Sequence, residues 1–400
     1  MNVAVFSFGC RANQYDAQVL REQVRAAGHD VVDAGAQVGI INACCVTAKA
    51  EKDCRNLVRR LHRRGVRVVV TGCFLPQMLV GLPAEAYPRG SLPRGLAADV
   101  VGGIHGFEGH LRAYVKVEDG CEGMCTYCIV PRVRGPVRSR TTAEVVGEMR
   151  RLVSRGFSEI VLTGVNLGAY GTDTGQRLED IVEASLGIEG LRRLRLSSLE
   201  PAFITGELLR ALANSPSFCP HFHIPLQSGS DRVLRMMARR MSAGGYLRLV
   251  ERVRKYVPGA TVTTDVIVGF PGETEEDVAE TCRVIEEVQF LAVHLFPFSP
   301  RPGTPAASLP GRVPPDEMSR RKRRVRECAR SVRAHVLAGL VGTRQEILAE
   351  CGKAGVWRGY TAGYVPAEVK ARGAMRGQLV PFLVREVRQE RLAGDREAGW

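Results

Sequence analysis

The stretch Val115-Lys-Val-Glu-Asp-Gly-Cys-Glu-Gly-Met-Cys-Thr-Tyr-Cys-Ile-Val-Pro-Arg132 places three cysteines in a C-x3-C-x2-C pattern: Cys121, Cys125 and Cys128. Three thiolates on one short loop can converge on one metal centre. A four-iron cubane needs four ligands, so three cysteines leave one iron open to another molecule. Structural zinc is the alternative, but it requires a closed set of four ligands. Because His105 and His110 lie upstream at irregular spacing and no second knuckle follows, the triplet favours an iron–sulfur cluster.

Composition narrows the class of protein. A chain of 400 residues is long enough for about two or three domains. It has no apolar run of transmembrane length, and its first residues lack the basic region and cleavage site of a signal peptide. We therefore expect a cytoplasmic protein, in which twelve cysteines indicate metal ligation more than disulfides.

The net charge of +14 comes mostly from arginine, and the arginines are clustered. A GC-rich genome also enriches arginine, and a solvated helix face explains any single run. Three runs in one chain favour an RNA or DNA partner. They are Arg59, Arg60, Arg63, Arg64 and Arg67; Arg132, Arg134, Arg138 and Arg140; and Ser319–Arg326, continuing to Arg330 and Arg333.

Residues 1–80 read as an α/β unit. We expect strands at 2–7, 39–41 and 66–71, with helices at 16–27 and 48–63. Each strand leads to a cysteine, namely Cys10, Cys44 and Cys73. Because ligands bind beyond the carboxyl ends of parallel strands, these three thiols are candidates for a second cluster. Each one separately is also explained as a small buried apolar residue.

The rest of the chain divides into two further patterns. A proline-rich linker at 82–94 precedes six βα repeats, with strands at 113–117, 159–162, 193–196, 221–224, 261–268 and 291–296. Six repeats predict a partial (βα)6 barrel with its site at the carboxyl ends of the strands. Residues 341–388 predict a small β-barrel of four strands, a common shape for RNA binding. The fold class is α/β, and the predicted domains are 1–95, 107–338 and 339–388, followed by a frayed tail at 389–400.

Six motifs in order along the chain carry a family resemblance. They are Phe8-Gly-Cys-Arg-Ala-Asn-Gln-Tyr-Asp16, Ile41-Asn-Ala-Cys-Cys-Val-Thr47, Val70-Thr-Gly-Cys73, Gly120-Cys-Glu-Gly-Met-Cys-Thr-Tyr-Cys-Ile-Val-Pro131, His223-Ile-Pro-Leu-Gln-Ser-Gly-Ser-Asp231 and Asp265-Val-Ile-Val-Gly-Phe-Pro-Gly-Glu-Thr274. Together they resemble the radical-SAM methylthiotransferases over nearly the whole chain. The resemblance implies an N-terminal cluster-binding domain, a radical-SAM barrel that uses S-adenosylmethionine (SAM), and a C-terminal TRAM-like domain.

The family has three branches. The MtaB type acts on threonylcarbamoyladenosine beside the tRNA anticodon, the MiaB type on isopentenyladenosine, and the RimO type on an aspartate of a ribosomal protein. The sequences around Cys10 and Cys44, together with Ser197-Ser-Leu-Glu200, are most similar to the MtaB type. A radical-SAM methyltransferase and a non-catalytic iron–sulfur RNA-binding protein are the alternatives of other classes.

The resemblance also implies roles for individual residues, and no catalytic side chain beyond the cluster ligands. Cys121, Cys125 and Cys128 would hold the radical-generating 4Fe-4S cluster, and Cys10, Cys44 and Cys73 an auxiliary 4Fe-4S cluster. The candidate SAM-pocket residues are Gly164, Asn166, Ser198, Glu200, Gln227, Ser228, Asp265 and Gly269, although turns and helix caps also explain these residue types. The expected partners are a tRNA anticodon loop, held by Arg320, Arg321, Arg323 and Arg324, and a reductant such as flavodoxin or ferredoxin.

Three features depart from the family pattern. Cys45 adjoins Cys44, so the second ligand of the auxiliary cluster is ambiguous. Adjacent side chains at a strand end point in opposite directions, and only one of them can face a cluster. Cys54 is a further thiol, and the stretch from Cys73 to Cys121 is shorter than family members usually show.

Overall fold

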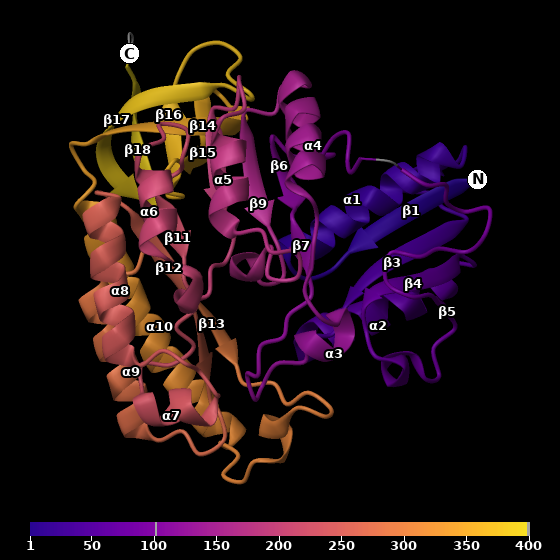
Figure 1. Cartoon of the computed structure of the whole chain (residues 1–400), viewed down its shortest axis with the longest axis horizontal. Coiled ribbons are helices and arrows are strands. Elements are labelled where there is room, and N and C mark those ends of the chain that lie inside the picture. Colours follow the sequence, from indigo (N-terminus) through magenta and orange to yellow (C-terminus); the bar gives the residue numbers. More distant parts are fainter. Residues whose placement is uncertain (101, 398–400) are drawn as a thin grey trace. The chain divides into compact units, whose positions relative to one another are not determined.

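The computed structural model describes residues 1–100 and 102–397, which form two compact units (Figure 1). Unit 1 comprises the described residues of 1–156 together with 160–190 and 299–307. Unit 2 comprises 157–159, 191–298 and the described chain from 308 onward. No helix of the described chain combines the length and apolar character needed to cross a bilayer.

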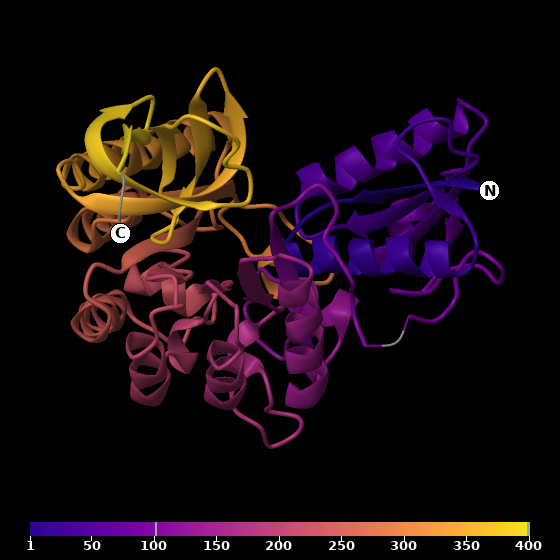
Figure 2. The same cartoon turned by 90° about the horizontal axis from the view of Figure 1, so that it is seen from above.

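Unit 1 begins with a parallel sheet in the order β2-β1-β3-β4-β5. Its strands are β1 (Asn2–Ser7), β2 (Asp30–Val31), β3 (Val38–Cys44), β4 (Arg67–Cys73) and β5 (Glu85–Ala86). Helices α1 (Arg11–Ala26) and α2 (Ala48–His62) cover opposite faces of this sheet (Figure 2), so that β3 is buried along its whole length. The predicted strands and the α2 helix are confirmed. Helix α1 begins at Arg11, earlier than the predicted residue 16, with Cys10 as its N-cap.

The second part of unit 1 carries the cysteine triplet. Strand β9 (Glu159–Thr163) lies beside β6 (Arg112–Lys116), and the short strands β7 (Glu118–Asp119) and β8 (Arg138–Ser139) pair with each other on either side of the triplet. Its helices are α3 (Val130–Arg134), α4 (Thr142–Ser154) and α5 (Leu178–Leu186), with the 3-10 turn η2 (Leu167–Ala169). The other 3-10 turn of unit 1, η1 (Pro76–Leu79), lies between β4 and β5. The triplet therefore occupies the connection between β7 and α3.

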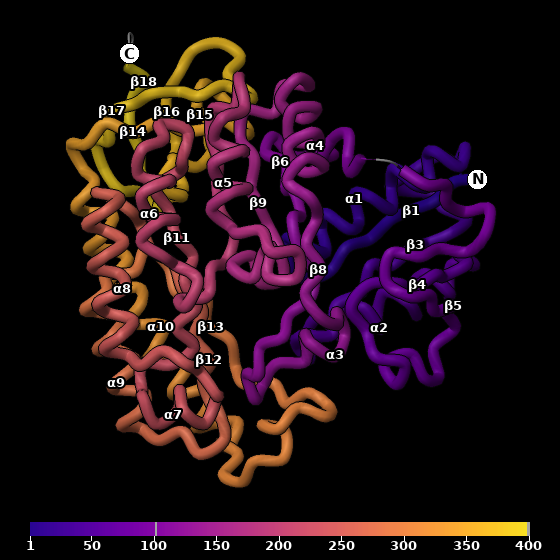
Figure 3. The backbone as a smooth tube through the Cα atoms, in the orientation of Figure 1, coloured from indigo at the N-terminus to yellow at the C-terminus, as the bar shows by residue number. Residues whose placement is uncertain are grey.

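Unit 2 continues the predicted βα alternation. Strands β11 (His221–His223), β12 (Thr261–Val268) and β13 (Ala292–Pro297) form a parallel sheet, and β10 (Arg193–Leu196) precedes them. The helices are α6 (Gly206–Ala213), α7 (Asp231–Met236), α8 (Ala243–Tyr256), α9 (Glu275–Val288) and α10 (Pro315–Ala338), with turns η3 (Pro201–Phe203) and η4 (Pro305–Ser308), most of the latter belonging to unit 1. Helices α8, α9 and α10 lie side by side (Figure 3).

Unit 2 ends in a closed five-stranded barrel in the order β14-β15-β16-β18-β17. The strands are β14 (Arg344–Lys353), β15 (Val356–Thr361), β16 (Pro366–Lys370), β17 (Leu379–Arg388) and β18 (Arg391–Arg396). The prediction of a frayed tail from residue 389 is wrong as far as Arg396, because β18 closes the barrel between β16 and β17. Leu392 and Ala393 are buried in it, but arginines and acidic residues around them hide the apolar pattern.

A buried ion pair and its hydrogen bonds hold this barrel against the neighbouring strands within unit 2. Arg195 is fully buried, its Nε lies 3.1 Å from Glu159, and another of its nitrogens donates to the Ala362 carbonyl at 2.8 Å. Arg193 donates to the Glu346 carbonyl at 2.7 Å. Because the two arginines bind backbone carbonyls of the barrel, they fix its position within unit 2.

Backbone contact between β14 and β15 yields a stability prediction. A Cβ at Gly359 would lie 1.8 Å from the Leu348 carbonyl oxygen, so Gly359→Ala must displace paired backbone. We expect the variant to lose about 1–3 kcal/mol of unfolding free energy, measured by chemical denaturation. Gly244→Ala in α8 is the control, because its Cβ would meet nothing nearer than 3.6 Å. Equal stability of the two variants would contradict the barrel register.

Candidate functional site

The N-terminal cysteine trio comes together at the carboxyl end of the unit 1 sheet. Cys44 and Cys73 are the last residues of β3 and β4 and lie opposite each other in the parallel register. Neighbouring strands are about 4.8 Å apart, which sets the scale of this separation. Cys10 lies at the N-terminus of α1, close enough to add to the rise that burial causes in the pKa of both other thiols. The structure thus brings the three predicted residues to one place.

Gly9 leaves the space that the thiol of Cys44 occupies. Its φ of +91° favours glycine, and a Cβ there would lie 2.7 Å from the Cys44 Sγ. Gly72, beside Cys73, also has a positive φ of +97°. The two glycines therefore belong to the construction of the cysteine site, and the Gly-Cys pairs are the signal for it in the sequence.

The structure separates Cys44 from its neighbour Cys45. Cys45 packs in the apolar cluster beneath α2 that contains Cys54 and Leu57, and its carbonyl accepts a hydrogen bond from Arg301 at 3.1 Å. Cys44 is absent from that cluster and lies against Gly9. This alternation supports Cys44 as the residue that faces Cys10 and Cys73.

The trio is chemically suited to a metal centre. Burial raises the pKa of Cys44 to about 11 and that of Cys73 to about 12, although Arg134 opposes the shift at Cys73. Thiols with such pKa values stay neutral until a metal replaces the proton, so that binding releases protons. The N-terminus of α1 adds positive potential beside Cys10.

Arg134 is the principal polar contact of the trio. Its Nε donates to the Cys73 Sγ at 2.8 Å, and its other nitrogens donate to Asp119 at 2.8 Å, to Asp16 at 3.3 Å and to Asn13. Its side chain is only 2% exposed. The sequence pattern grouped Arg134 with arginines that were expected to bind an anionic polymer, but the structure places it in the interior of unit 1.

The second trio lies on the connection between β7 and α3. Its thiols are partly exposed, and the amide of Cys121 donates to the Gly135 carbonyl at 3.0 Å. The Gly123 amide donates to the Cys121 Sγ at 3.3 Å, and Asn166 Nδ2 lies 3.8 Å from the same sulfur. The predicted residue Asn166 therefore does adjoin the triplet.

Glu118, three residues before Cys121, was not anticipated from the sequence. It is 1% exposed, and one of its carboxylate oxygens accepts the backbone N–H of Asn166. The other oxygen has no hydrogen-bond partner among the described residues. A Cβ at Gly164 would lie 2.1 Å from this carboxylate, so Gly164 must lack a side chain. Burial raises the pKa of Glu118 to about 8. An incompletely bonded buried carboxyl group beside the triplet suits a ligand that carries an amino group.

The other predicted SAM-pocket residues follow strands of unit 2. Backbone bridges join Ser198 to His223 and Gln227 to Val266, so the strand ends form one rim. Gln227 has a positive φ of 70°, which is uncommon for a residue with a side chain. The remaining four residues each have a partner: Glu200 pairs with Arg239, Ser228 accepts the Ser230 amide, Asp265 lies 3.2 Å from His223, and the Gly269 amide donates to Glu273.

The basic helix α10 has an inner and an outer face. Arg321 is buried in ion pairs with Glu273, Glu275 and Glu317. Arg320, Arg323 and Arg324 are exposed. The sequence could not show which of the four arginines is buried, because contacts with α9 decide which face of α10 points inward.

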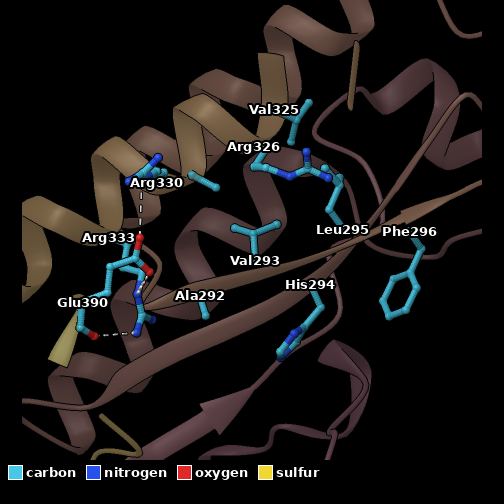
Figure 4. Close-up of a pocket in the computed structure, with 11 residues that line it drawn as sticks. Ala292, Val293, His294, Leu295, Phe296, Val325, Arg326, Arg330, Arg333 and Glu390 are labelled. Atoms are coloured by element: carbon cyan, nitrogen blue, oxygen red, sulfur yellow. Dashed lines mark hydrogen bonds and ion pairs between the residues drawn. The ribbon is translucent and has the colours of Figure 1, made fainter. Parts of the chain in front are cut away.

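A cavity of about 680 Å³ lies in unit 2 between α10 and β13 (Figure 4). Val293 and Leu295 point toward the helix, whereas His294 and Phe296 point away from it (Figure 4). Arginines line the helix side: Arg326, Arg330 and Arg333. The last two pair with Glu390 at 3.4 Å.

The two cysteine trios supply the thiolate donors that iron–sulfur clusters use. Among the described residues, no group of three His, Cys, Asp or Glu side chains is close enough to hold one metal ion. A cubane presents separate irons to separate thiolates, so its ligands need not meet at a point. Two sets of three cysteines in unit 1, one beside an incompletely bonded carboxyl group, match this requirement.

Comparison with known proteins agrees with this site. Residues 2–82 match the model of Uncharacterized protein family UPF0004, and residues 115–285 match the radical SAM superfamily. The threonylcarbamoyladenosine tRNA methylthiotransferase MtaB of Thermotoga maritima is 36% identical over 92% of this chain and 91% of its own. The tRNA-2-methylthio-N(6)-dimethylallyladenosine synthase of Thermobifida fusca is 35% identical over 87% and 78%.

A solved structure supports the fold. The radical S-adenosylmethionine methyltransferase TsrM from Kitasatospora setae superposes with a TM-score of 0.56 at 15% identity, covering 76% of each chain. At this identity the likeness concerns the fold alone. The two family models, the full-length relatives and the shared fold lead to one assignment: the chain belongs to the radical-SAM methylthiotransferase family and is a tRNA-modifying enzyme.

Proposed function

We propose that this enzyme is of the MtaB type and adds a methylthio group to C2 of N6-threonylcarbamoyladenosine at position 37 of tRNA. The observation that carries the proposed methylthio transfer is the N-terminal cysteine trio, Cys10, Cys44 and Cys73, in the same compact unit as the triplet. The MtaB-named relatives of Thermotoga maritima and Bacillus subtilis, at 36% and 33% identity, support the substrate. The dimethylallyladenosine enzymes at 35% identity make the MiaB type the alternative.

The two trios divide the proposed chemistry. Cys121, Cys125 and Cys128 would hold the 4Fe-4S cluster implied by radical-SAM membership, and Cys10, Cys44 and Cys73 a second one. When bound, these groups and SAM supply the radical and the sulfur that no side chain can provide. The chain itself binds SAM and orients the adenine. We further propose a cytoplasmic location and a reductant of the flavodoxin or ferredoxin kind.

Glu118 completes the SAM pocket that we propose. Its incompletely bonded carboxyl group lies beside Asn166 and Gly164, in the part of unit 1 that holds the triplet. An α-ammonium group would both pair with this carboxylate and lower its raised pKa. Six strand-end residues of unit 2 stay candidates for SAM binding on the family resemblance alone: Ser198, Glu200, Gln227, Ser228, Asp265 and Gly269.

We place the anticodon stem-loop on the outer face of α10 and on the C-terminal barrel, which we propose to be TRAM-like. Arg320, Arg323 and Arg324 are exposed there, and Arg326 lines the adjoining cavity. Arginines on one exposed face bind phosphates with an affinity that falls as salt rises. Arg321 is excluded from this surface because its guanidinium is held inside unit 2.

The substrate assignment has a direct test. Purified, reconstituted enzyme is incubated with SAM, reductant and either of two tRNAs, one carrying threonylcarbamoyladenosine and the other isopentenyladenosine. We expect the methylthio mass increment, detected by nucleoside mass spectrometry, only on the first. Modification of the second alone would replace our proposal by the MiaB type, and a methyl increment without sulfur would refute both.

Iron content tests the ligand assignment. We expect reconstituted enzyme to hold about eight irons per chain and Cys44→Ala about four, with SAM cleavage retained. Cys45→Ala is the matched control and should keep both clusters, because its side chain packs in the apolar cluster with Cys54. The opposite result for the two variants would show that Cys45 is the ligand.

Glu118→Gln tests the SAM pocket. The amide keeps the size of the side chain but cannot pair with an ammonium group, so we expect SAM to bind at least tenfold more weakly, measured by equilibrium dialysis. Iron content should stay unchanged, because Glu118 is not a ligand. Unchanged affinity for SAM would remove Glu118 from the pocket.

Charge reversal tests the RNA surface. We expect Arg323→Glu combined with Arg326→Glu to weaken binding of an anticodon stem-loop at least tenfold and to flatten its salt dependence. Arg248→Glu combined with Lys255→Glu, two exposed residues of α8, makes the same change in net charge and is the control. Both are measured by fluorescence anisotropy. Equal loss in the control would mean that only net charge matters.

A further inference from the structure

Arg134 connects the two cysteine trios of unit 1. It is the last residue of α3, a helix that begins two residues after Cys128, yet its Nε donates to Cys73 of the other trio at 2.8 Å. The residue after it, Gly135, accepts the amide of Cys121 at 3.0 Å. One short segment therefore contacts a residue of each trio.

The rest of the guanidinium group binds segments that flank both trios. Asp119, which accepts at 2.8 Å, lies two residues before Cys121. Asp16, which accepts at 3.3 Å, lies on α1, the helix capped by Cys10. Lys116 contacts both of these carboxylates. The contacts hold the planar guanidinium on several sides, so the direction of its Nε–H toward Cys73 is fixed.

The network of charged side chains around Arg134 carries one more positive than negative charge. Arg134, Lys116 and Arg89 supply three positive charges, and Asp16 and Asp119 supply two negative ones. All five side chains are at most about a quarter exposed, so water screens the imbalance weakly. A ligating Cys73 thiolate would supply the missing negative charge at the atom that Arg134 already contacts.

We propose that Arg134 is a positioning residue for the auxiliary cluster, raising its reduction potential through the hydrogen bond to Cys73. This rests on the proposed function only in requiring a cluster at Cys10, Cys44 and Cys73. A hydrogen bond and a positive charge at a ligating sulfur stabilise the more negative, reduced cluster. A cluster with a higher potential is easier to keep reduced by the same donor as the radical-generating cluster.

The decisive experiment is a redox titration followed by electron paramagnetic resonance. It is carried out on the full-length chain with Cys125→Ala, which leaves the auxiliary cluster as the only one. Arg134→Met removes the charge and the hydrogen bond, and Arg134→Lys keeps the charge without the fork of donors. Arg140→Met is the matched control, because Arg140 is also an internal ion-paired arginine, 2.6 Å from Glu148. Its hydrogen bonds within the described chain go to Tyr15, the Lys116 carbonyl and Glu148 rather than to a cysteine.

We expect Arg134→Met to shift the midpoint potential to more negative values, Arg134→Lys to shift it less, and Arg140→Met to leave it in place. A midpoint unchanged in Arg134→Met with full iron would overturn the proposal. If Arg134→Met fails to retain iron, Arg134→Lys decides the question. Retained iron with a small negative shift of the midpoint in Arg134→Lys supports the proposal, and retained iron with an unshifted midpoint overturns it. If neither variant retains iron, Arg140→Met is the reference, because it also leaves a buried carboxylate unpaired. Iron retained in Arg140→Met supports the proposal, and iron lost there too shows a general structural role and overturns it.

Failure of the proposed function gives a different result. In that case the parent chain with Cys125→Ala would hold no cluster at all, before any change at Arg134. Iron analysis of the parent therefore separates the two outcomes.

Discussion

The contact between the Arg134 guanidinium and the Cys73 sulfur is the interaction on which the organisation of unit 1 depends. A buried arginine is stable only when its donors are satisfied, and here they are satisfied by a thiol and by residues of two separate segments. Removing one partner of such a network leaves charge buried and unpaired, which costs about 3–5 kcal/mol. The network therefore joins the five-stranded sheet to the segment with the cysteine triplet at a fixed distance.

A second constraint comes from the geometry of parallel strands. Because side chains alternate between the faces of a strand, Cys44 and Cys45 at the end of β3 cannot both face the same ligand. Apolar packing beneath α2 takes Cys45, and the positive φ of Gly9 makes room for Cys44. The distinction between a cluster ligand and a core residue thus follows from ordinary packing of the sheet.

Most of the architecture could be predicted from the sequence because its patterns are local. Apolar runs such as β3 and β12, and the amphipathic helices between them, depend on neighbouring residues alone, and these predictions are confirmed. Cysteine spacing marked the triplet, and the positions of Cys10, Cys44 and Cys73 after three predicted strands marked the other trio. What could not be predicted depends on contacts distant in sequence. The carboxylates that surround Arg321 come partly from a different helix, and β18 becomes a strand by closing the barrel rather than by its own apolar pattern.

The same reasoning explains why some arginines of the basic runs are buried and others are exposed. Arginine is long enough to serve either as a surface charge or as an internal connector, and composition does not distinguish the two. Arg134 and Arg321 meet carboxylates within the fold, whereas Arg323 and Arg326 lie on the exposed side of α10. An internal arginine neutralised by acidic partners contributes little to the field outside the protein. The attraction for RNA must therefore come from the exposed arginines, because internal ion pairs cancel and add nothing to the net charge of +14.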